Sequence, residues 1–413
     1  RQVFLSVSLS WVSASLFGAL PMFFATDMSY TDCFFEAMSG FTTTGASILT
    51  DIESLPHGIL FWRSFTHWLG GMGIIVFYIA ILPLYGVGGV QLFKAEVPGP
   101  VADKITPRVR ETAKFLWIVY VGITAVEAFA LMVAGMDVFD AICHSLTTMP
   151  TGGFSTKNAS IGHYDSLGIH YIIIFFMFLA GINFSLHFRA ISGDFKSYIK
   201  DREFLVYLSG IIVVTSVIFL AIAVQSSHFS GLNFRESLFA TVSIMTTTGF
   251  GSADYEMWPA VVQVILLSLM FVGGMGGSTA GGMKVIRCML LVKYAALETR
   301  RVLHSRALIP VRIGNQLVIE DVVRNTLGFF LFFMSAFVLS TIALAAIGLD
   351  LESAIGAAAS AMGNIGPGLN QFGPTDNYAL LSDPGKWILT FCMLLGRLEI
   401  FTVMVLFSRT FWK

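Results

Sequence analysis

The sequence predicts an all-α polytopic membrane protein in which four membrane-helix/pore-loop/membrane-helix units surround a central pore. Composition is the first reason: 55% of the 413 residues are hydrophobic and 12% are charged, against about 25% charged in a soluble domain. Such a chain cannot cover its apolar surface with charge. The second reason is a short pattern, apolar residues followed by threonine and glycine, that occurs four times between long apolar stretches. A net charge of −1 leaves no basic footprint for nucleic acid.

Eight stretches are long and apolar enough to cross a bilayer, which takes about 20 residues of helix. They are residues 2–24, 58–85, 113–134, 168–192, 204–225, 258–294, 322–347 and 385–408. As one helix, the sixth would be about 55 Å long, whereas the hydrocarbon core measures about 30 Å. It also contains the glycine-rich run 273–282, and each glycine costs about 1 kcal/mol in a helix interior. We therefore expect two half-helices joined by an irregular intramembrane loop at 273–282.

The charges set the orientation of these spans. Most Lys and Arg residues lie in the connections after the second, fourth and sixth stretches, while the connections after the first, third, fifth and seventh contain only Lys157 and Arg235. Connections rich in Lys and Arg stay in the cytoplasm. The other connections, which carry many of the acids, are therefore expected outside.

The outer connections share one pattern. Each has an acid, then about ten small and apolar residues, then a glycine 12 to 14 residues after the acid. The acids are Asp32, Asp140, Glu236 and Glu352, and the glycines are Gly45, Gly152, Gly249 and Gly366. Acids suit helix N-termini, and ten residues of helix span roughly 15 Å, about half the membrane. Each outer connection is therefore expected to be a re-entrant half-helix followed by an extended segment.

Four such segments around one axis would form a cation filter. The inward end of each half-helix is negative, glycine permits conformations that a Cβ forbids, and a ring of backbone carbonyls can replace the hydration shell of a cation. Close helix packing would explain a single Thr/Gly motif, but four copies in register favour the pore. The expected filter residues are Thr43, Thr44, Gly45, Pro150, Thr151, Gly152, Thr247, Thr248, Gly249, Asn364, Ile365 and Gly366.

With these four loops the chain resembles the Trk/Ktr/HKT superfamily of potassium transporters. Residues 86–99, 276–287 and 396–402 are similar to its Trk branch in particular, and the resemblance covers essentially the whole chain. It implies K⁺-selective uptake, also of Rb⁺, down the electrochemical gradient across a bacterial inner membrane, with K⁺ at the filter and no tightly bound organic cofactor. It also implies a homodimer in the lipid bilayer and a cytosolic ring of RCK-type, TrkA-like nucleotide-binding subunits that controls gating.

The resemblance also suggests boundaries. The expected units are residues 1–86, 112–195, 203–296 and 321–413, with cytoplasmic linkers at 87–111 and 297–320. Pro150 departs from the family pattern, which puts the local geometry of the second filter segment in doubt. In plant relatives, Ser at the first filter glycine accompanies Na⁺ transport, so glycine at all four positions favours K⁺. Trk members usually carry an N-terminal helix pair that this chain lacks, through truncation or natural absence.

A gate is expected beneath the filter. A central Arg such as Arg397 costs about 2.5–3.5 kcal/mol in a membrane helix, so it either pairs with an acid such as Glu399 or faces a wet cavity, where its charge opposes a resting cation. Glu399 is two residues away and points to another helix face, so we favour the cavity. The glycine-rich loop would move beside Arg397. Its expected gate residues are Gly273, Gly274, Gly276, Gly277, Ser278, Thr279, Gly281 and Gly282.

Several other polar residues have more than one explanation. Lys284 and Arg287 are expected either to anchor at the inner interface or to take part in gating. The basic stretch 298–312 would bind lipid headgroups or the regulatory partner, and we favour the partner. His67, His144 and His187 are expected to be hydrogen-bonded packing residues.

Two other functions compete with a passive pore. A Na⁺- or H⁺-coupled potassium symporter with alternating access would usually show inverted repeats, whereas these four repeats all enter from the same side. A membrane enzyme is not expected, because the chain has no H-E-x-x-H, G-x-S-x-G or Walker A motif. No catalytic residue is therefore assigned.

Overall fold

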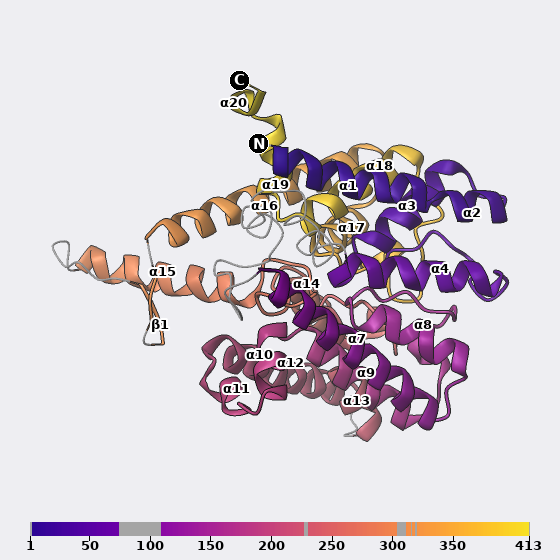
Figure 1. Ribbon diagram of the computed structural model, residues 1–413, viewed down its shortest axis with the longest axis horizontal. Coiled ribbons are helices and arrows are strands. Elements are labelled where there is room, and N and C mark those ends of the chain that lie inside the picture. Colours follow the sequence, from indigo (N-terminus) through magenta and orange to yellow (C-terminus); the bar gives the residue numbers. More distant parts are fainter. Residues whose placement is uncertain are drawn as a thin grey trace.

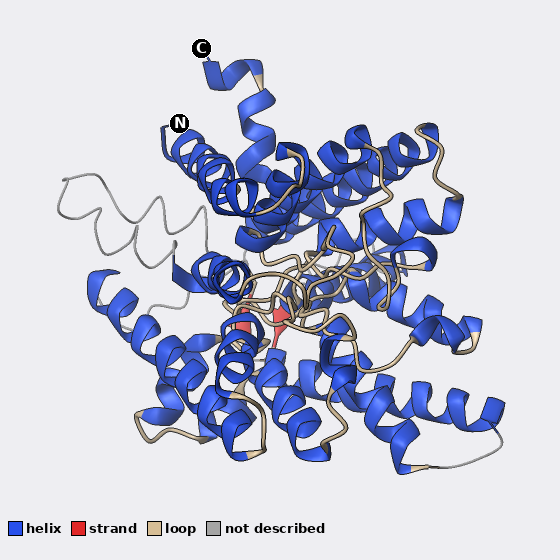
Figure 2. Ribbon diagram, turned by 90° about the vertical axis from the view of Figure 1, so that its right-hand side faces the viewer, coloured by secondary structure: helices blue, strands red, loops and turns tan. Residues whose placement is uncertain are grey.

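The computed structural model describes residues 2–73, 109–226, 230–303, 311–314, 316–318 and 320–412. Helices surround a central region of loops, as Figure 2 shows. The expected linker at 87–111 and the end of the second stretch lie largely outside the described residues, as does the family-like stretch 86–99.

Four spans are long and apolar enough to cross a membrane in the described part of the chain. The first runs over Phe4–Ala25 and combines α1 (Gln2–Gly18) with α2 (Leu20–Ala25). The others are α7 (Val109–Val133), α12 (Arg202–Ser226) and α16 (Glu320–Ala346). Their lipid-facing sides carry exposed residues such as Phe129, Val213 and Leu339. Apolar side chains therefore cover the outside of the bundle as well as filling its core.

Each of these spans is followed by a short buried helix, and a polar side chain caps its N-terminus. These helices are α3 (Tyr30–Phe41), α8 (Val138–Thr148), α13 (Gly231–Met245) and α17 (Leu351–Gly363). The caps are Ser29, Asp137, Ser230 and Asp350, and each accepts a hydrogen bond from a backbone N–H of the first turn. Such caps satisfy N–H groups that a helix leaves free at its start. The helices therefore begin at the polar end of each outer connection and run inward.

A second helix follows each short helix, and all four of these second helices are interrupted. The helix α4 (His57–Trp68) passes into a π-helical turn, Leu69–Gly73. Between α14 (Ala260–Met270) and α15 (Val285–Leu303), residues 271–284 are not helical. The other two pairs are sharply bent, by 102° between α9 (Leu167–Ala180) and α10 (Phe184–Ile191) and by 109° between α18 (Asp383–Arg397) and the segment Phe401–Phe407.

The two bends correct the prediction that 168–192 and 385–408 are uninterrupted spans. Asn183 caps α10 with its side chain, and Glu399 and Ile400 have positive φ angles of 54° and 49°. A β-branched residue such as Ile400 rarely adopts this conformation. Hydropathy does not report such breaks, because the residues around them remain apolar.

Smaller elements complete the chain. They are α11 (Lys196–Lys200), α19 (Phe401–Met404), α20 (Arg409–Trp412), the strands β1 (Arg312–Ile313) and β2 (Gln316–Leu317), and the short turns Ser160–His163, Tyr255–Met257, Asn370–Phe372 and Val405–Phe407. The strands pair antiparallel. Helix α15, this hairpin and the start of α16 extend away from the bundle in Figure 1. The basic stretch 298–312, which is expected in the linker 297–320, therefore begins within α15.

The core consists mainly of two buried clusters. One joins α1, α3 and α4 to α16, α17 and α18, and includes Phe35, Met362 and Met393. The other joins the helices from α7 to α14, and includes Leu131, Tyr207 and Phe239. The first and last parts of the chain thus pack against each other, which closes the bundle around its central loops.

Candidate functional site

The four short helices end in the same backbone conformation. One to three residues after the end of each helix, one residue is left-handed: Thr43, Thr151, Thr247 and Asn364 have φ angles of 53° to 58°. The next N–H bonds back to a carbonyl five residues earlier, as from Thr44 to Ser39 at 2.9 Å and from Ile365 to Ser360 at 3.0 Å. This is the Schellman arrangement that satisfies the last carbonyls of a helix. Threonine and asparagine take the place that glycine usually fills.

Two residues further along, a glycine with positive φ follows in every segment. These glycines are Gly45, Gly153, Gly249 and Gly366, with φ angles of 81°, 82°, 79° and 105°. The expected position in the second segment, Gly152, is therefore wrong by one residue. Gly152 occupies the place of Thr44, and Pro150 precedes the pattern. The glycine spacing misled because two glycines are adjacent here.

The four segments contact one another in a closed ring. A methyl group on Gly45 would lie 2.1 Å from the Gly152 carbonyl oxygen, and one on Gly153 would lie 2.0 Å from that of Thr248. One on Gly249 would lie 1.7 Å from the Ile365 oxygen. The ring closes at Gly366, whose added methyl would lie 2.8 Å from the Thr44 oxygen. Since all these distances are far below van der Waals contact, no side chain fits at any of the four glycines.

The carbonyls that meet these glycines belong to Thr44, Gly152, Thr248 and Ile365, which hold the same place in the four segments. Each of these four carbonyl oxygens therefore lies against the glycine of a neighbouring segment. Among the described residues, no group of three or more His, Cys, Asp or Glu side chains could hold a metal ion.

The threonine hydroxyls of the segments form hydrogen bonds with other side chains of the same or a neighbouring segment. Thr42 and Thr44 share a 2.8 Å hydrogen bond, as do Thr246 and Thr248. The Asn364 amide donates to the Thr44 hydroxyl at 2.9 Å. These contacts fix the segments relative to their helices and to one another.

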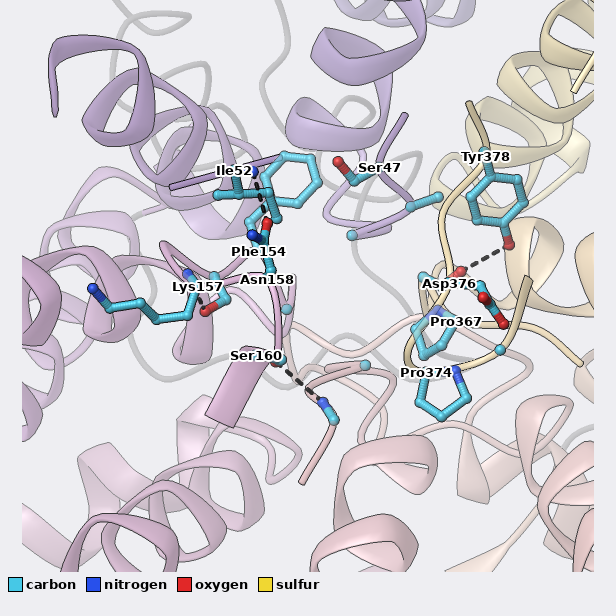
Figure 3. Close-up of a pocket in the computed structure, with 18 of the residues that line it drawn as sticks. Ser47, Ile52, Phe154, Lys157, Asn158, Ser160, Pro367, Pro374, Asp376 and Tyr378 are labelled. Atoms are coloured by element: carbon cyan, nitrogen blue, oxygen red, sulfur yellow. Dashed lines mark hydrogen bonds between the residues drawn. The ribbon is translucent and has the colours of Figure 1, made fainter. Parts of the chain in front are cut away.

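A cavity opens on the outer side of the ring. All four glycines of the ring line it, together with residues that follow them, such as Ser47, Phe154 and Pro367. Figure 3 shows these side chains and Tyr378 around the opening. Tyr378 donates to the Gly366 carbonyl at 2.9 Å, and Ser360 does so at 2.8 Å. The cavity therefore leads from the outer surface to the ring.

Two acids near this cavity have shifted pKa values. Burial, together with the negative charges of Asp254 and Asp376, raises the pKa of Glu256 to about 7. A hydrogen bond from Asn158 lowers the pKa of Asp51. Glu256 therefore binds its proton more tightly in the folded protein than an ordinary glutamate does.

The glycine-rich loop lies on the opposite side of the ring. Thr279 donates to the Met149 carbonyl at 2.9 Å, and the Gly281 N–H donates to the Thr247 hydroxyl at 2.6 Å. A methyl group on Gly281 would lie 2.2 Å from the Gly363 oxygen. The loop therefore touches the inner ends of the second, third and fourth short helices.

Arg397, the last residue of α18, lies beside this loop. Its guanidinium donates to the Thr279 carbonyl at 2.9 Å and to the carbonyls of Gly70 and Gly71 at 2.6 and 2.9 Å. It also lies 5.8 Å from the ring of Trp11. One charged group thus joins the loop to the π-helical turn of the first unit, and both sit below the ring.

The carbonyls that accept these hydrogen bonds come from the points at which the inner helices are interrupted. The π-helical turn presents the oxygens of Gly70 and Gly71 to Arg397. At the end of α9, Ala180 accepts from Thr279 at 3.2 Å, and Gly181 accepts from the Met275 N–H at 2.9 Å. Unpaired carbonyls are costly within a membrane, so each break is stable only with such a partner.

The loop is also held from its cytoplasmic end. Glu203, in the first turn of α12, accepts from the N–H groups of Gly276 and Ile286 at 2.7 and 3.0 Å. Lys284 is buried and donates to the Ala280 carbonyl. Arg287 pairs with Glu399 at 2.5 Å. The acid considered as a partner for Arg397 therefore binds Arg287.

Sequence reasoning missed a buried ion pair behind the ring. Arg63 of α4 and Glu36 of α3 lie 2.7 Å apart, with side chains that are 1% and 0% exposed. A signal was present, because both charges stand within apolar membrane segments, where charged residues are rare. His144, expected as a hydrogen-bonded packing residue, contacts the Asp140 carbonyl and the Ser155 hydroxyl at 2.7 and 2.9 Å.

The comparisons with known proteins agree over the full length. Residues 1–413 match the model of the TrkH family, described as "Cation transport protein". The chain is 44% identical to the Trk system potassium uptake protein TrkH of Escherichia coli (strain K12), covering 100% of this chain and 86% of that protein. It is 37% identical to TrkG of the same organism, with the same coverage. The crystal structure of the potassium transporter TrkH from Vibrio parahaemolyticus superimposes with a TM-score of 0.88 at 41% identity, covering 99% of this chain and 85% of that one.

The backbone register predicts that Gly153→Ala destabilises the protein. Its left-handed conformation costs an alanine roughly 1–2 kcal/mol, and the added methyl would also meet the Thr248 oxygen. Gly122→Ala is the control, because a methyl there meets nothing within 4 Å and alanine favours helix. Thermal unfolding in detergent should show a lower midpoint for Gly153→Ala alone. An equal midpoint for the two variants would contradict the register.

The raised pKa of Glu256 predicts a pH-dependent stability. The folded protein holds this proton up to about pH 7 and the unfolded chain only to about 4.5. The stabilisation is therefore complete below the lower value and is lost as the pH rises through the higher one. Between about pH 4.5 and about pH 7, the free energy of unfolding should fall less for Glu256→Gln than for wild type. Glu298→Gln is the control and should behave as wild type does. Parallel curves for wild type and Glu256→Gln would refute the prediction.

Proposed function

Since the chain belongs to the TrkH family of cation transport proteins, we propose that it takes up potassium across a bacterial inner membrane through a pore built by a single chain. The ring of four backbone carbonyls supports this proposal most directly. It lies between an outer cavity and an inner loop, as a filter between a vestibule and a gate would. The name "potassium uptake protein" of the E. coli relative indicates the ion.

The filter replaces the water around K⁺ with carbonyl oxygens. These come from the residues Thr43 to Gly45, Thr151 to Gly153, Thr247 to Gly249 and Asn364 to Gly366. Because the carbonyls are held by the ends of four helices, the ring is preorganised and an entering ion meets oxygens already in place. The negative helix ends add attraction for a cation. Pro150, expected in the filter, precedes it in this proposal.

The driving force is the membrane potential. A potential of 100 mV is worth about 2.3 kcal/mol per charge, so a passive pore can concentrate K⁺ in the cell. A Na⁺- or H⁺-coupled symport is the alternative. The four segments all start at capped outer ends and run inward, which favours a pore over the inverted repeats of alternating access.

The gate in this proposal is the loop 271–284 with Arg397. The loop occupies the path directly below the ring, and the arginine places a positive charge beside it. Opening requires the loop to leave the inner ends of the short helices, which breaks the bonds of Thr279 and Gly281. Glycines suit such a segment because they tolerate changes of backbone conformation.

We further propose four pseudo-equivalent units with the boundaries given above, a homodimer, and control by a cytosolic nucleotide-binding ring. The common backbone pattern of the four segments supports the units. The partners rest on the family resemblance. The projecting α15 and hairpin offer a surface for them, since α15 ends with Arg300 and Arg301 in its last turn.

Transport in proteoliposomes tests the function. Purified protein should take up Rb⁺ when an inside-negative voltage is imposed, with little Na⁺ uptake and no accompanying proton movement. Gly249→Ser should abolish uptake, because a side chain there meets the Ile365 oxygen at 1.7 Å. Proton entry in a fixed ratio to Rb⁺ would favour the symporter, and absence of uptake by folded wild-type protein would refute both.

The gate predicts that Arg397→Ala raises Rb⁺ flux in the absence of any regulatory partner. Losing the charge and its three carbonyl bonds lowers the barrier and frees the loop, and a tenfold rise corresponds to about 1.4 kcal/mol. Arg397→Lys keeps the charge but loses the planar, forked guanidinium, so it should give a smaller rise in Rb⁺ flux. The exposed Arg324 supplies the control, Arg324→Ala. Unchanged or lower flux in folded Arg397→Ala would exclude the barrier.

A further inference from the structure

We propose that the buried pair Glu36–Arg63 sets ion selectivity by holding the first two filter segments at a fixed separation. Both are positioning residues, since they act on the filter through the segments that they hold, although Arg63 also lines the outer cavity. The inference rests on the proposed function and extends it to residues behind the filter.

The pair joins two helices of the first unit. The Arg63 Nη2 lies 2.7 Å from the Glu36 Oε1, and its Nε donates to the same oxygen at 2.8 Å. Both side chains are almost fully buried. Removing two charges from water is expensive, and their attraction rarely repays it. Stability alone is therefore a weak reason for this pair, and its other contacts indicate what it does.

Glu36 holds the first filter segment. Its Oε2 accepts from the Ile48 N–H at 3.0 Å, and its Oε1 accepts from the Ser47 hydroxyl at 3.0 Å. Ser47 and Ile48 follow the ring glycine Gly45 by two and three residues. The short helix α3 thus carries both the helix end that forms the filter and the carboxylate that ties down its outer arm.

Arg63 extends this link to the second segment. Its Nη1 donates to the Ser155 carbonyl at 3.2 Å, its Nη2 donates to the Ser47 hydroxyl at 3.2 Å, and its guanidinium lies 4.1 Å from the centre of the Phe154 ring. Phe154 and Ser155 directly follow the ring glycine Gly153. One planar, rigid group therefore spans the outer arms of two neighbouring segments, a geometry that a lysine cannot reproduce.

The remaining segments have a different support. In the register of the ring glycines, the positions equivalent to Glu36 are His144, Ala240 and Ala357. The fourth segment is tied by tyrosines instead: Tyr255, which follows the third segment along the chain, donates to the Gly368 carbonyl at 2.7 Å, and Tyr378 donates to that of Gly366 at 2.9 Å. The ion pair thus supports one half of the ring, and its loss leaves the other half in place.

This asymmetry determines the expected defect. Without the pair, the contact between Gly45 and the Gly152 carbonyl loses its buried support. The bond from the Ile52 N–H to the Asn158 Oδ1 at 2.7 Å still joins the two arms further out, so the first two segments can shift relative to each other without separating. A filter whose carbonyls adapt to a smaller ion loses its preference for K⁺. The pore should then still conduct, with lower selectivity.

The experiment measures Rb⁺ and Na⁺ uptake by purified variants in proteoliposomes under an imposed voltage. Arg63→Lys and Glu36→Gln should reduce the Rb⁺/Na⁺ uptake ratio about tenfold, equal to about 1.4 kcal/mol of differential binding. Ser47→Ala keeps the ion pair and removes one tie to each partner, so it should fold and lower the ratio by a smaller factor. The double variant Glu36→Gln/Arg63→Lys should be no worse than either single one, because both act through the same contact.

Leu131→Ala is the matched control. Leu131 is fully buried in α7, a helix that carries no filter segment, so its truncation lowers thermal stability without changing a filter residue. Its Rb⁺/Na⁺ ratio should equal that of wild type. If the ratio in Ser47→Ala and in a folded pair variant equals that of wild type, the pair is merely structural and the inference fails. If wild type itself shows no preference for Rb⁺, the proposed function fails first.

Discussion

The requirement that four glycines stay free of side chains governs the centre of this molecule. Each glycine lies against the carbonyl oxygen of the next segment, and the shortest contact, from a methyl on Gly249 to the Ile365 oxygen, would be 1.7 Å. A ring this tight forms only if every segment leaves its helix in the same direction. The left-handed residues Thr43, Thr151, Thr247 and Asn364 supply that direction. The conformation of one residue after each helix therefore decides whether the four oxygens face one axis.

The need to pair backbone polar groups explains the position of the glycine-rich loop beneath the ring. No water satisfies backbone groups in the hydrocarbon region, so a membrane helix that breaks must find internal partners. In the described residues, three of the four inner helices break and the remaining one, α4, passes into a π-helical turn. Arg397 and Thr279 bind the carbonyls released in the first two units, and Glu203 binds N–H groups at the far end of the loop. The loop is therefore stable in this position, because its polar groups are paired there.

The sequence indicated much of this arrangement and failed in particular places. Four acid-to-glycine spacings predicted the short helices and their convergence, and ten consecutive residues rich in glycine marked the loop. The register of the second segment was wrong because Gly152 and Gly153 are adjacent, and only the φ angles distinguish them. The breaks at Gly181–Asn183 and at Leu398–Ile400 were invisible to hydropathy, since a bend leaves composition unchanged. The pairing of Glu36 with Arg63 joins residues 27 positions apart, and their shared environment exists only in the fold.

Selectivity and gating place opposite demands on the same few residues. The proposed filter must be rigid, whereas the proposed gate must move, and the two are in contact through the bond from Gly281 to Thr247. The two demands act on opposite ends of the four segments. Ties on the outer side, from Arg63, Tyr378 and Tyr255, attach to the arms beyond the ring glycines. The loop attaches only to the inner ends, so its departure leaves the outer ties intact. A pore that opens from within can thus keep its carbonyls in place, which is the condition for an open state that still selects its ion.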